Sequence, residues 1–339
     1  MELWTVRTPE PGTIEHQAER AARAGWDGVA FTDSQNLIGD PFVAATLAGR
    51  AIEGLKVGTG VSNVATRHPA ALATVAATAN EETGGRFTLG VGRGDTALFH
   101  LGRAPQPVAA FEERLGQLQS YLRGETIDLD GHPSRIHWLD RARHGKTTLD
   151  VACSGPWVIG VAARIADSLT FAVGADPARL TWAMELALEE AEAAGRDPAE
   201  LGFGAYVNVG CHPDPDAARA LIAGTVAAFA HFSAMPGSTG AGLDERDRHV
   251  VEEVGRRYDS NQHLRNDAAH ADALDPDFVD RFAVVGPPET CVERLATLGE
   301  LGLGRLVLTG AGMRADRDDA KLSGRLLATE VLPALKGDT

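Results

Sequence analysis

Cysteine is scarce in this chain of 339 residues: only Cys153, Cys211 and Cys291 occur, far apart in sequence. An odd number without paired spacing argues against both a disulfide framework and a cysteine-rich zinc site. Positive charge is also deficient, because 32 Lys and Arg stand against 47 Asp and Glu, a formal net charge of −15. A surface that acidic repels phosphate backbones and anionic lipid, and no basic stripe offsets it, so we expect neither nucleic-acid nor membrane binding.

Long hydrophobic runs are also missing. The longest uncharged stretch, Ala220–Leu243, contains His231, Pro236 and a second half rich in Gly, Ser and Thr, so it reads as a helix followed by a loop. The N-terminus lacks the basic and apolar segments of a signal peptide. These absences predict a cytoplasmic protein.

Short apolar segments alternate with segments of helical spacing, which often begin at Pro or end at Gly. The predicted strands are 3–6, 28–32, 55–60, 87–92, 150–153, 169–173, 203–209 and 305–309. Eight strand-and-helix units favour an α/β fold of the (β/α)₈ TIM-barrel class over an open doubly wound sheet, which shows the same alternation.

Two segments interrupt this alternation. Residues 125–139 have the pattern of a hairpin, and residues 235–280 form a long polar excursion that contains several histidines. Insertions after barrel strands lie over the C-terminal face, where ligands bind. Because no segment has the composition of a linker, we expect a single domain over residues 1–339, with a lid-like insertion around 235–280.

Two glycine-containing strand ends are the first candidate ligand contacts. The stretch VGTGVSNVATRHPA (57–70) ends a strand in glycines, which either let a flat ligand approach the backbone or simply form a tight turn. In LGVGRGD (89–95), Asp95 stands where a dinucleotide fingerprint would have its last glycine. We expect Gly94 and Asp95 at the barrel mouth, where the carboxylate could orient a ring N–H or move a proton. The alternative is that Asp95 caps a turn.

A third strand end, ACSGPW (152–157), continues into a helix whose N-terminus favours an anion such as a phosphate. Cys153 is expected to pack as a small apolar residue, since no nucleophile elbow is present. Asp33 ends the second predicted strand, where it either faces the mouth or caps a turn.

The histidines carry no clear metal motif. His132, His137 and His144 are near one another but lack helical metal-pair spacing, so no metal site is expected. His231, His263 and His270, with Tyr258, could line a substrate pocket or simply face solvent.

Five segments in this order resemble the luciferase-like flavin and deazaflavin oxidoreductase superfamily. The closer likeness is to the branch that uses coenzyme F-420, such as methylenetetrahydromethanopterin reductase. The segments are AARAGWDGVAFTDS (21–34), VGTGVSNVATRHPA (57–70), GGRFTLGVGRGD (84–95), ACSGPWVIGVAARIADS (152–168) and VGPPETCVERLATLGELGLGRL (285–306). The likeness spans nearly the whole chain. It implies a (β/α)₈ barrel, a homodimer, and an isoalloxazine-type ring at the C-terminal mouth.

The resemblance also implies roles for particular residues near the ring. It places a non-prolyl cis peptide at Gly60–Val61, against the back face of the ring. Asp33 and Asp95 match acidic positions near the ring, and Asn63 matches a ring contact from the loop after strand three.

At the phosphate end the resemblance assigns the backbone of Ser154, Gly155 and Pro156 to the cofactor phosphate. Some relatives add Thr and Lys after strand six, where this chain has Ala172 and Ala175, which leaves Gly174 as the remaining contact.

A second departure from the family pattern is Ser34, which stands where some relatives have a catalytic histidine after the acid of strand two. Proton transfer would then rest on Asp95, on a histidine of the insertion, or on substrate and water.

These observations lead to one hypothesis and two alternatives. The hypothesis is a coenzyme F-420-dependent oxidoreductase that transfers a hydride to a small imine, enone or carbonyl compound, with Asp33 and Asp95 as candidate catalytic residues. One alternative is a two-component monooxygenase that uses reduced FMN, oxygen and a separate reductase. The other is a non-catalytic flavin-binding barrel.

Overall fold

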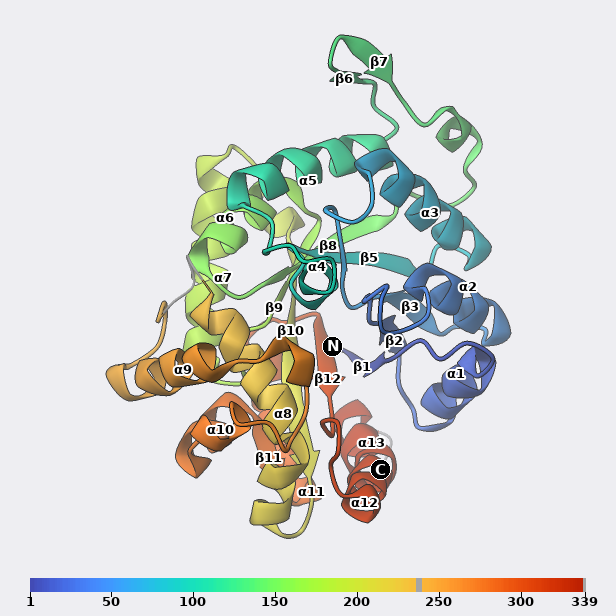
Figure 1. Cartoon of the computed structure of the whole chain (residues 1–339). Helices are drawn as coiled ribbons and strands as arrows, with labels where there is room; N and C mark the ends of the chain where they lie inside the picture. Colours follow the sequence, from blue (N-terminus) through green and yellow to red (C-terminus); the bar gives the residue numbers. More distant parts are fainter. Residues whose placement is uncertain (236–239, 338–339) are drawn as a thin grey trace. The chain divides into compact units, whose positions relative to one another are not determined.

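The computed structural model describes residues 1–235 and 240–337, which form two compact units (Figure 1). The N-terminal unit holds residues 4–152 and 161–169, and the C-terminal unit holds residues 1–3, 153–160 and those from 170 onward. Within them, parallel strands alternate with helices as in a (β/α)₈ barrel, so the predicted fold class is confirmed. Residues 236–239, inside the expected insertion, lie outside the described residues.

The N-terminal unit is built on parallel strands that pair in the order β1, β2, β3, β5 and β8, with the short β4 alongside β5. Their bounds are β1 Glu2–Arg7, β2 Gly28–Phe31, β3 Lys56–Thr59, β4 Ser62–Asn63, β5 Phe87–Gly92 and β8 Thr148–Cys153. The helices between them are α1 Ile14–Arg23, α2 Pro41–Ala51, α3 Pro69–Glu82, α4 Thr96–Phe99 and α5 Val108–Leu122. The predicted hairpin is present as β6 Ile127–Leu129 and β7 His132–Ser134.

The C-terminal unit is centred on β10 Gly202–Cys211, which pairs in parallel with β12 Arg305–Thr309 and with β11 Val284–Gly286, and also pairs with β9 Ser168–Phe171. Its helices are α6 Pro156–Ile165, which continues into the other unit, α7 Pro177–Ala193, α8 Pro215–Ala234, α9 Glu245–Arg257, α10 Pro276–Phe282, α11 Pro288–Glu300, α12 Arg317–Leu326 and α13 Leu332–Lys336. A π-helical segment, Leu327–Val331, joins the last two.

Several helices begin where the sequence supplies a cap. Asp40 accepts hydrogen bonds from the Phe42 and Val43 N–H groups at the start of α2, and Asp214 caps α8 in the same way through Asp216 N. A proline at the first position follows each cap, where its missing N–H costs no hydrogen bond.

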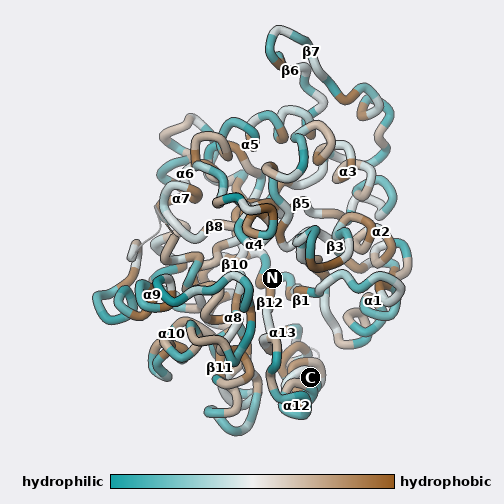
Figure 2. The backbone as a smooth tube through the Cα atoms, in the orientation of Figure 1, coloured by the Kyte–Doolittle hydropathy of each residue, from teal (hydrophilic) through white to brown (hydrophobic). Residues whose placement is uncertain are grey.

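The expected polar excursion contains the helices α9 and α10, which the sequence pattern did not predict. Figure 2 shows α9 as a largely hydrophilic helix, and only Asp247, Val250, Val251 and Val254 are buried along it. So narrow an apolar stripe in a charged segment gives a weak helical signal in sequence. Helix formation here depends on packing against α8.

Helix α8 is long and apolar enough to cross a membrane by length and composition, but 61% of its apolar window is buried inside the protein. Its buried residues include Leu221, Ile222, Val226 and Phe229. Such burial is typical of the core helix of a folded domain, and agrees with the expected helix in 220–243.

Close approach between β3 and β5 explains why residues 58 and 90 of the N-terminal unit are glycines. A Cβ at Gly90 would lie 2.2 Å from the Thr59 carbonyl oxygen, and a Cβ at Gly58 would lie 2.5 Å from the Thr88 carbonyl oxygen. The Thr59 hydroxyl donates a hydrogen bond of 2.6 Å to the Gly90 carbonyl. Two glycines of the sequence motifs therefore serve strand packing rather than ligand approach.

We predict that Gly90→Ala lowers the free energy of unfolding by about 3 kcal/mol or more, because backbone atoms of a buried strand must move to admit the methyl group. Urea unfolding followed by circular dichroism measures the change. Gly116→Ala is the matched control: Gly116 lies within α5 with open space around its Cβ position, so alanine should raise stability by about 0.5–1 kcal/mol. Equal stability of Gly90→Ala and wild type would contradict the packing argument.

Candidate functional site

Asp33 is a buried carboxyl group just beyond the end of β2. Its side chain is 3% exposed. The Ser62 hydroxyl donates a hydrogen bond of 2.6 Å to its Oδ2, and Arg67 Nε lies 3.8 Å from the same oxygen. Burial raises the pKa of Asp33, and the contacts with Ser62 and Arg67 offset part of that rise. Asp33 therefore keeps a proton to higher pH than a surface aspartate.

Arg67 connects Asp33 to a second carboxyl group, Asp40. One guanidinium nitrogen of Arg67 lies 2.7 Å from Asp40 Oδ2, and the guanidinium carbon stacks 4.9 Å from the centre of the Phe42 ring. Burial opposes ionisation of Asp40, but hydrogen bonds from Val43 N and Arg67 outweigh it and lower the Asp40 pKa. The pKa values of the two carboxyl groups around Arg67 are thus shifted in opposite directions, upward for Asp33 and downward for Asp40.

The peptide bond between Gly60 and Val61 is cis, as the family resemblance implied. It lies between β3 and β4, directly before Ser62. Both methyl groups of Val61 face β5, since Cβ atoms built at Gly90 and Gly92 would each lie 3.2 Å from one of them.

Asn63 is 2% exposed, and its side chain organises its own loop. Its Oδ1 accepts hydrogen bonds from the Ala65 N–H, the Thr66 N–H and the Thr66 hydroxyl, at 2.8–3.1 Å. The amide oxygen is fully used in this turn, so the predicted contact with a ring remains a prediction for the rest of the side chain.

Asp95 lies at the start of the one-turn helix α4, but its carboxyl group makes no capping hydrogen bond there. The preceding Gly94 has φ +78°, and a Cβ on it would lie 3.5 Å from Asn63 Cγ. Gln35 Nε2, two residues beyond Asp33, donates to the Ala97 carbonyl at 2.8 Å. The structure therefore brings the loops that carry Asp33, Asn63, Gly94 and Asp95 together in one unit.

The other predicted contacts belong to the C-terminal unit. Ser154 follows β8, and its hydroxyl donates a hydrogen bond of 3.1 Å to the Phe232 carbonyl of α8. The Ala172 N–H donates to the Cys153 carbonyl at 2.7 Å, so the loop that leads to Gly174 starts beside the loop of Ser154, Gly155 and Pro156. The two predicted phosphate loops are thus neighbours. Cys153 is buried, as expected.

Gly174 has a structural reason to be glycine. Its φ is +91°, and a Cβ on it would lie 2.8 Å from the Phe282 ring. The next residue, Ala175, donates its N–H to the Phe282 carbonyl at 2.7 Å. The contact of Gly174 with a phosphate stays a prediction.

An arginine that sequence reasoning missed lies behind the Gly174 loop. Arg179, on the first turn of α7, is 1% exposed and donates hydrogen bonds to the Val173 carbonyl (2.7 Å) and to the Ser233 hydroxyl (3.0 Å). Burial lowers its pKa to about 10, so it is charged at neutral pH. A usable sequence signal existed, because Arg179 shares the four-residue spacing of the buried Ala183, Ala187 and Ala191.

His231 of α8 and two histidines of the insertion, His263 and His270, form an aromatic cluster around Tyr258. The His231 ring stacks on Tyr258 with centres 3.8 Å apart and planes 4° apart, and the His270 ring lies 4.5 Å away on Tyr258 as well. The Tyr258 hydroxyl and His263 Nδ1 are hydrogen bonded. His270 is 1% exposed, and burial lowers its pKa. These four side chains are partly or fully buried rather than solvated.

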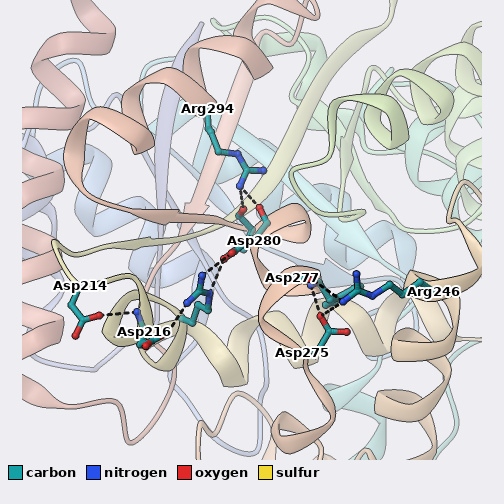
Figure 3. Close-up of polar contacts among 10 residues, drawn as sticks. Asp214, Asp216, Arg246, Asp275, Asp277, Asp280 and Arg294 are labelled. Carbon is teal, nitrogen blue, oxygen red and sulfur yellow. Dashed lines mark hydrogen bonds and ion pairs between the residues drawn. The ribbon is translucent and has the colours of Figure 1, made fainter.

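Side-chain hydrogen bonds and an ion pair join the insertion to neighbouring helices of its unit. Figure 3 shows that Arg246 is ion-paired with Asp275 and Asp277 inside the insertion, and that Arg294 of α11 donates to the Asp280 main-chain carbonyl at its end. The Asp280 carboxylate is ion-paired with Arg219 of α8. Asn266 accepts from the Gly224 N–H of α8 and donates to carbonyls of the same helix. These contacts favour a fixed position for the insertion over a movable lid. The lid-like behaviour stays a prediction.

Across the described ranges, no group of three or more His, Cys, Asp or Glu side chains is arranged to hold a metal ion. The site residues that sequence reasoning missed are Ser62, Arg67 and Asp40 in one unit and Arg179 and Ser233 in the other. Of these residues, only Arg179 had a signal in the sequence, its spacing. The others are recognised by their contacts in the structure.

The (β/α)₈ scaffold carries a buried carboxyl group, Asp33, beyond the end of β2 in the N-terminal unit, and in the C-terminal unit a helix, α6, that begins directly after Gly155. A family model, described as luciferase-like monooxygenase, matches residues 3–305. The chain belongs to this luciferase-like family and is an enzyme, an oxidoreductase.

Among characterised relatives, the chain is 26% identical over 318 residues to 5,10-methylenetetrahydromethanopterin reductase of Methanolobus tindarius, covering 92% of this chain and 94% of the relative. The structure of coenzyme F-420-dependent tetrahydromethanopterin reductase from Methanopyrus kandleri superposes with a TM-score of 0.74 at 22% identity, covering 98% of this chain and 99% of that one. This superposition supports the barrel fold.

A structure with FMN is also similar. The oxygenating constituent of 3,6-diketocamphane monooxygenase from Pseudomonas putida, in complex with FMN, has a TM-score of 0.62 at 19% identity and covers 98% of both chains. At that identity the likeness concerns the fold.

We predict that Asp33→Asn raises the free energy of unfolding at pH 7 by about 1 kcal/mol, because it removes a charge whose burial is costly and keeps an acceptor for Ser62. The sign follows from the raised pKa: the stability that Asp33 contributes is complete below its unfolded pKa of 3.8 and is lost as pH rises through the folded value. The gain should therefore vanish near pH 3.5.

Urea unfolding at several pH values measures this difference. Asp40→Asn is the matched control, because the lowered pKa of Asp40 predicts the opposite sign: a loss of stability at pH 7 that disappears at low pH. A loss of stability in both variants at pH 7 would refute the assignment of opposite shifts.

Proposed function

We propose that this protein is a coenzyme F-420-dependent oxidoreductase that transfers a hydride between the reduced deazaflavin and a small unsaturated organic molecule, such as an imine, an enone or a carbonyl compound. The observation that carries the proposal is similarity along nearly the whole chain to methylenetetrahydromethanopterin reductase, together with the F-420-dependent reductase of Methanopyrus kandleri.

The residues present fit a coenzyme with a flat ring and an anionic tail. In the N-terminal unit, Asp33 is a buried carboxyl group beside the Gly60–Val61 turn. In the C-terminal unit, α6 begins directly after Ser154 and Gly155, and the buried cation Arg179 lies behind the neighbouring Gly174 loop. A helix N-terminus and a buried positive charge suit an anion.

The bound coenzyme would supply the hydride, and the protein would supply orientation and proton exchange. Because Oδ2 of Asp33 takes the contacts with Ser62 and Arg67, we assign proton exchange with a ligand to Oδ1. Its raised pKa means that the carboxyl group keeps its proton to higher pH than a surface aspartate, which suits proton exchange. Asp95 at the start of α4 is the second candidate.

A monooxygenase that uses reduced FMN is the second candidate function. The family description and the structural likeness to an FMN-bound monooxygenase favour it. It would require a separate reductase and would consume oxygen in the presence of substrate, whereas a hydride transfer to an organic acceptor consumes none.

The cofactor is tested by titrating the apo-protein with F-420 and with FMN, each oxidised and reduced, and following ring fluorescence. We expect reduced F-420 to bind at least tenfold more tightly than reduced FMN. Tighter binding of FMN, combined with oxygen uptake when a reductase and NADH are added, would replace the proposal with the monooxygenase.

The role of the two carboxyl groups is tested by Asp33→Asn and Asp95→Asn. With cyclohexenone, cyclohexanone and a cyclic imine as acceptors, we expect each variant to keep its F-420 affinity within about threefold and to lose about 100-fold in turnover, since general acid catalysis typically contributes that much. Asp128→Asn, on the exposed hairpin, is the control. Unchanged turnover in both variants would remove these carboxyl groups from the mechanism, and an absence of turnover in the wild type with every acceptor would favour a non-catalytic barrel.

The homodimer implied by the family resemblance and the cytoplasmic location predicted from the amino-acid sequence form part of this proposal. Light scattering on the purified chain checks the dimer.

A further inference from the structure

Arg179 is a buried cation without an ion pair. No carboxylate of the described residues lies within salt-bridge distance of its guanidinium, and its buried Nε has no hydrogen-bond acceptor there. The acidic groups that act on it through space are Asp176 and Asp247. Asp176 caps α7 through the Ala178 N–H, and Asp247 is ion-paired with Arg281. Both carboxylates are thus engaged elsewhere.

Burying an unpaired charge is costly, so a protein that keeps one needs a compensating interaction. Apolar residues of similar volume would stabilise the surroundings of α7 better, because the residues at the same face are Ala183, Ala187 and Ala191. An anionic ligand in the neighbouring loop would supply the missing negative charge.

The geometry shows how the charge reaches that loop. The guanidinium donates to the Val173 carbonyl, which belongs to the same peptide group as the Gly174 N–H. In a trans peptide the N–H points away from the carbonyl, and the Gly174 N–H makes no hydrogen bond to another described residue. A cation on the carbonyl polarises the peptide and makes its N–H a stronger donor to an anion.

The Gly174 loop is also next to the start of α6, through the bond from Ala172 N to the Cys153 carbonyl. Neither Ala172 nor Ala175 offers a hydroxyl or an ammonium group to an anion. The positive charge that positions 172 and 175 lack is present at Arg179, which bonds the Val173 carbonyl behind the loop.

We propose that Arg179 is a positioning residue for the phosphate of the coenzyme, and that it acts through the Val173–Gly174 peptide. The inference rests on the proposed function only in that the coenzyme carries a phosphate, which is true of both F-420 and FMN.

The test compares ligands with and without phosphate. Dissociation constants for FMN and riboflavin, and for F-420 and its phosphate-free chromophore, are measured by fluorescence on the full-length protein. The ratio within each pair gives the contribution of the phosphate end. We expect wild type to prefer the phosphorylated member, and Arg179→Met to reduce that ratio about tenfold while the affinity for the phosphate-free member stays the same.

Two further variants keep the test decisive. Arg179→Lys retains the charge and should retain part of the ratio, and it replaces the methionine variant should that one fail to fold. Arg86→Met is the matched control, because Arg86 also donates only to backbone carbonyls, those of Gly49, Ile52 and Leu55, in the other unit. Its ratio should equal that of wild type.

A structural role for Arg179 would lower the affinity for both members of each pair equally, and that result overturns the inference. An unchanged ratio in Arg179→Met, or a wild type that does not prefer the phosphorylated member of either pair, overturns it as well. Tighter binding of FMN than of F-420 would overturn the F-420 proposal. The role of Arg179 would then be decided by the ratio of the dissociation constants for riboflavin and FMN.

Discussion

The absence of a side chain at Gly90 is the constraint on which the N-terminal unit depends. The Thr59 carbonyl occupies the space that a Cβ at residue 90 would need, so β3 and β5 approach closely where β3 ends. That approach fixes the start of the Gly60–Val61 turn, and Ser62, one residue later, reaches the carboxyl group of Asp33. A packing requirement in the strands thus determines where the buried carboxyl group of Asp33 is held.

Asp33 in the N-terminal unit and Arg179 in the C-terminal unit are buried ionisable groups that no close ion pair neutralises. Asp33 has only a hydroxyl hydrogen bond and a distant guanidinium, and burial shifts its pKa upward. Arg179 bonds a carbonyl and a hydroxyl and has no carboxylate partner. Both arrangements cost stability in the free protein, which is typical of groups retained for ligand binding or catalysis.

Contacts changed the interpretation of several motif residues. Gly58 and Gly90 belong to the glycine-containing strand ends that the sequence offered as candidate ligand contacts, yet close strand packing requires them. Asn63 has its amide oxygen committed to Ala65 and Thr66, and Gly174 is required by its positive φ and by Phe282. The reason is general: glycine and asparagine are used for backbone geometry as often as for ligands, and a sequence does not distinguish the two uses.

The strand-helix alternation, the glycine-rich strand ends and the order of the family motifs were readable in the amino-acid sequence, because hydrophobic periodicity and helix caps are local properties. The family and the fold followed from them. The tertiary structure alone decided that Ser62 binds Asp33, that His231, Tyr258 and His270 stack, and that Arg179 bonds Val173 and Ser233. The burial and the pKa of a side chain depend on contacts between distant segments. Asp33 and Ser62 are 29 residues apart and Arg179 and Ser233 are 54 apart, and pairs so far apart in sequence leave no local pattern.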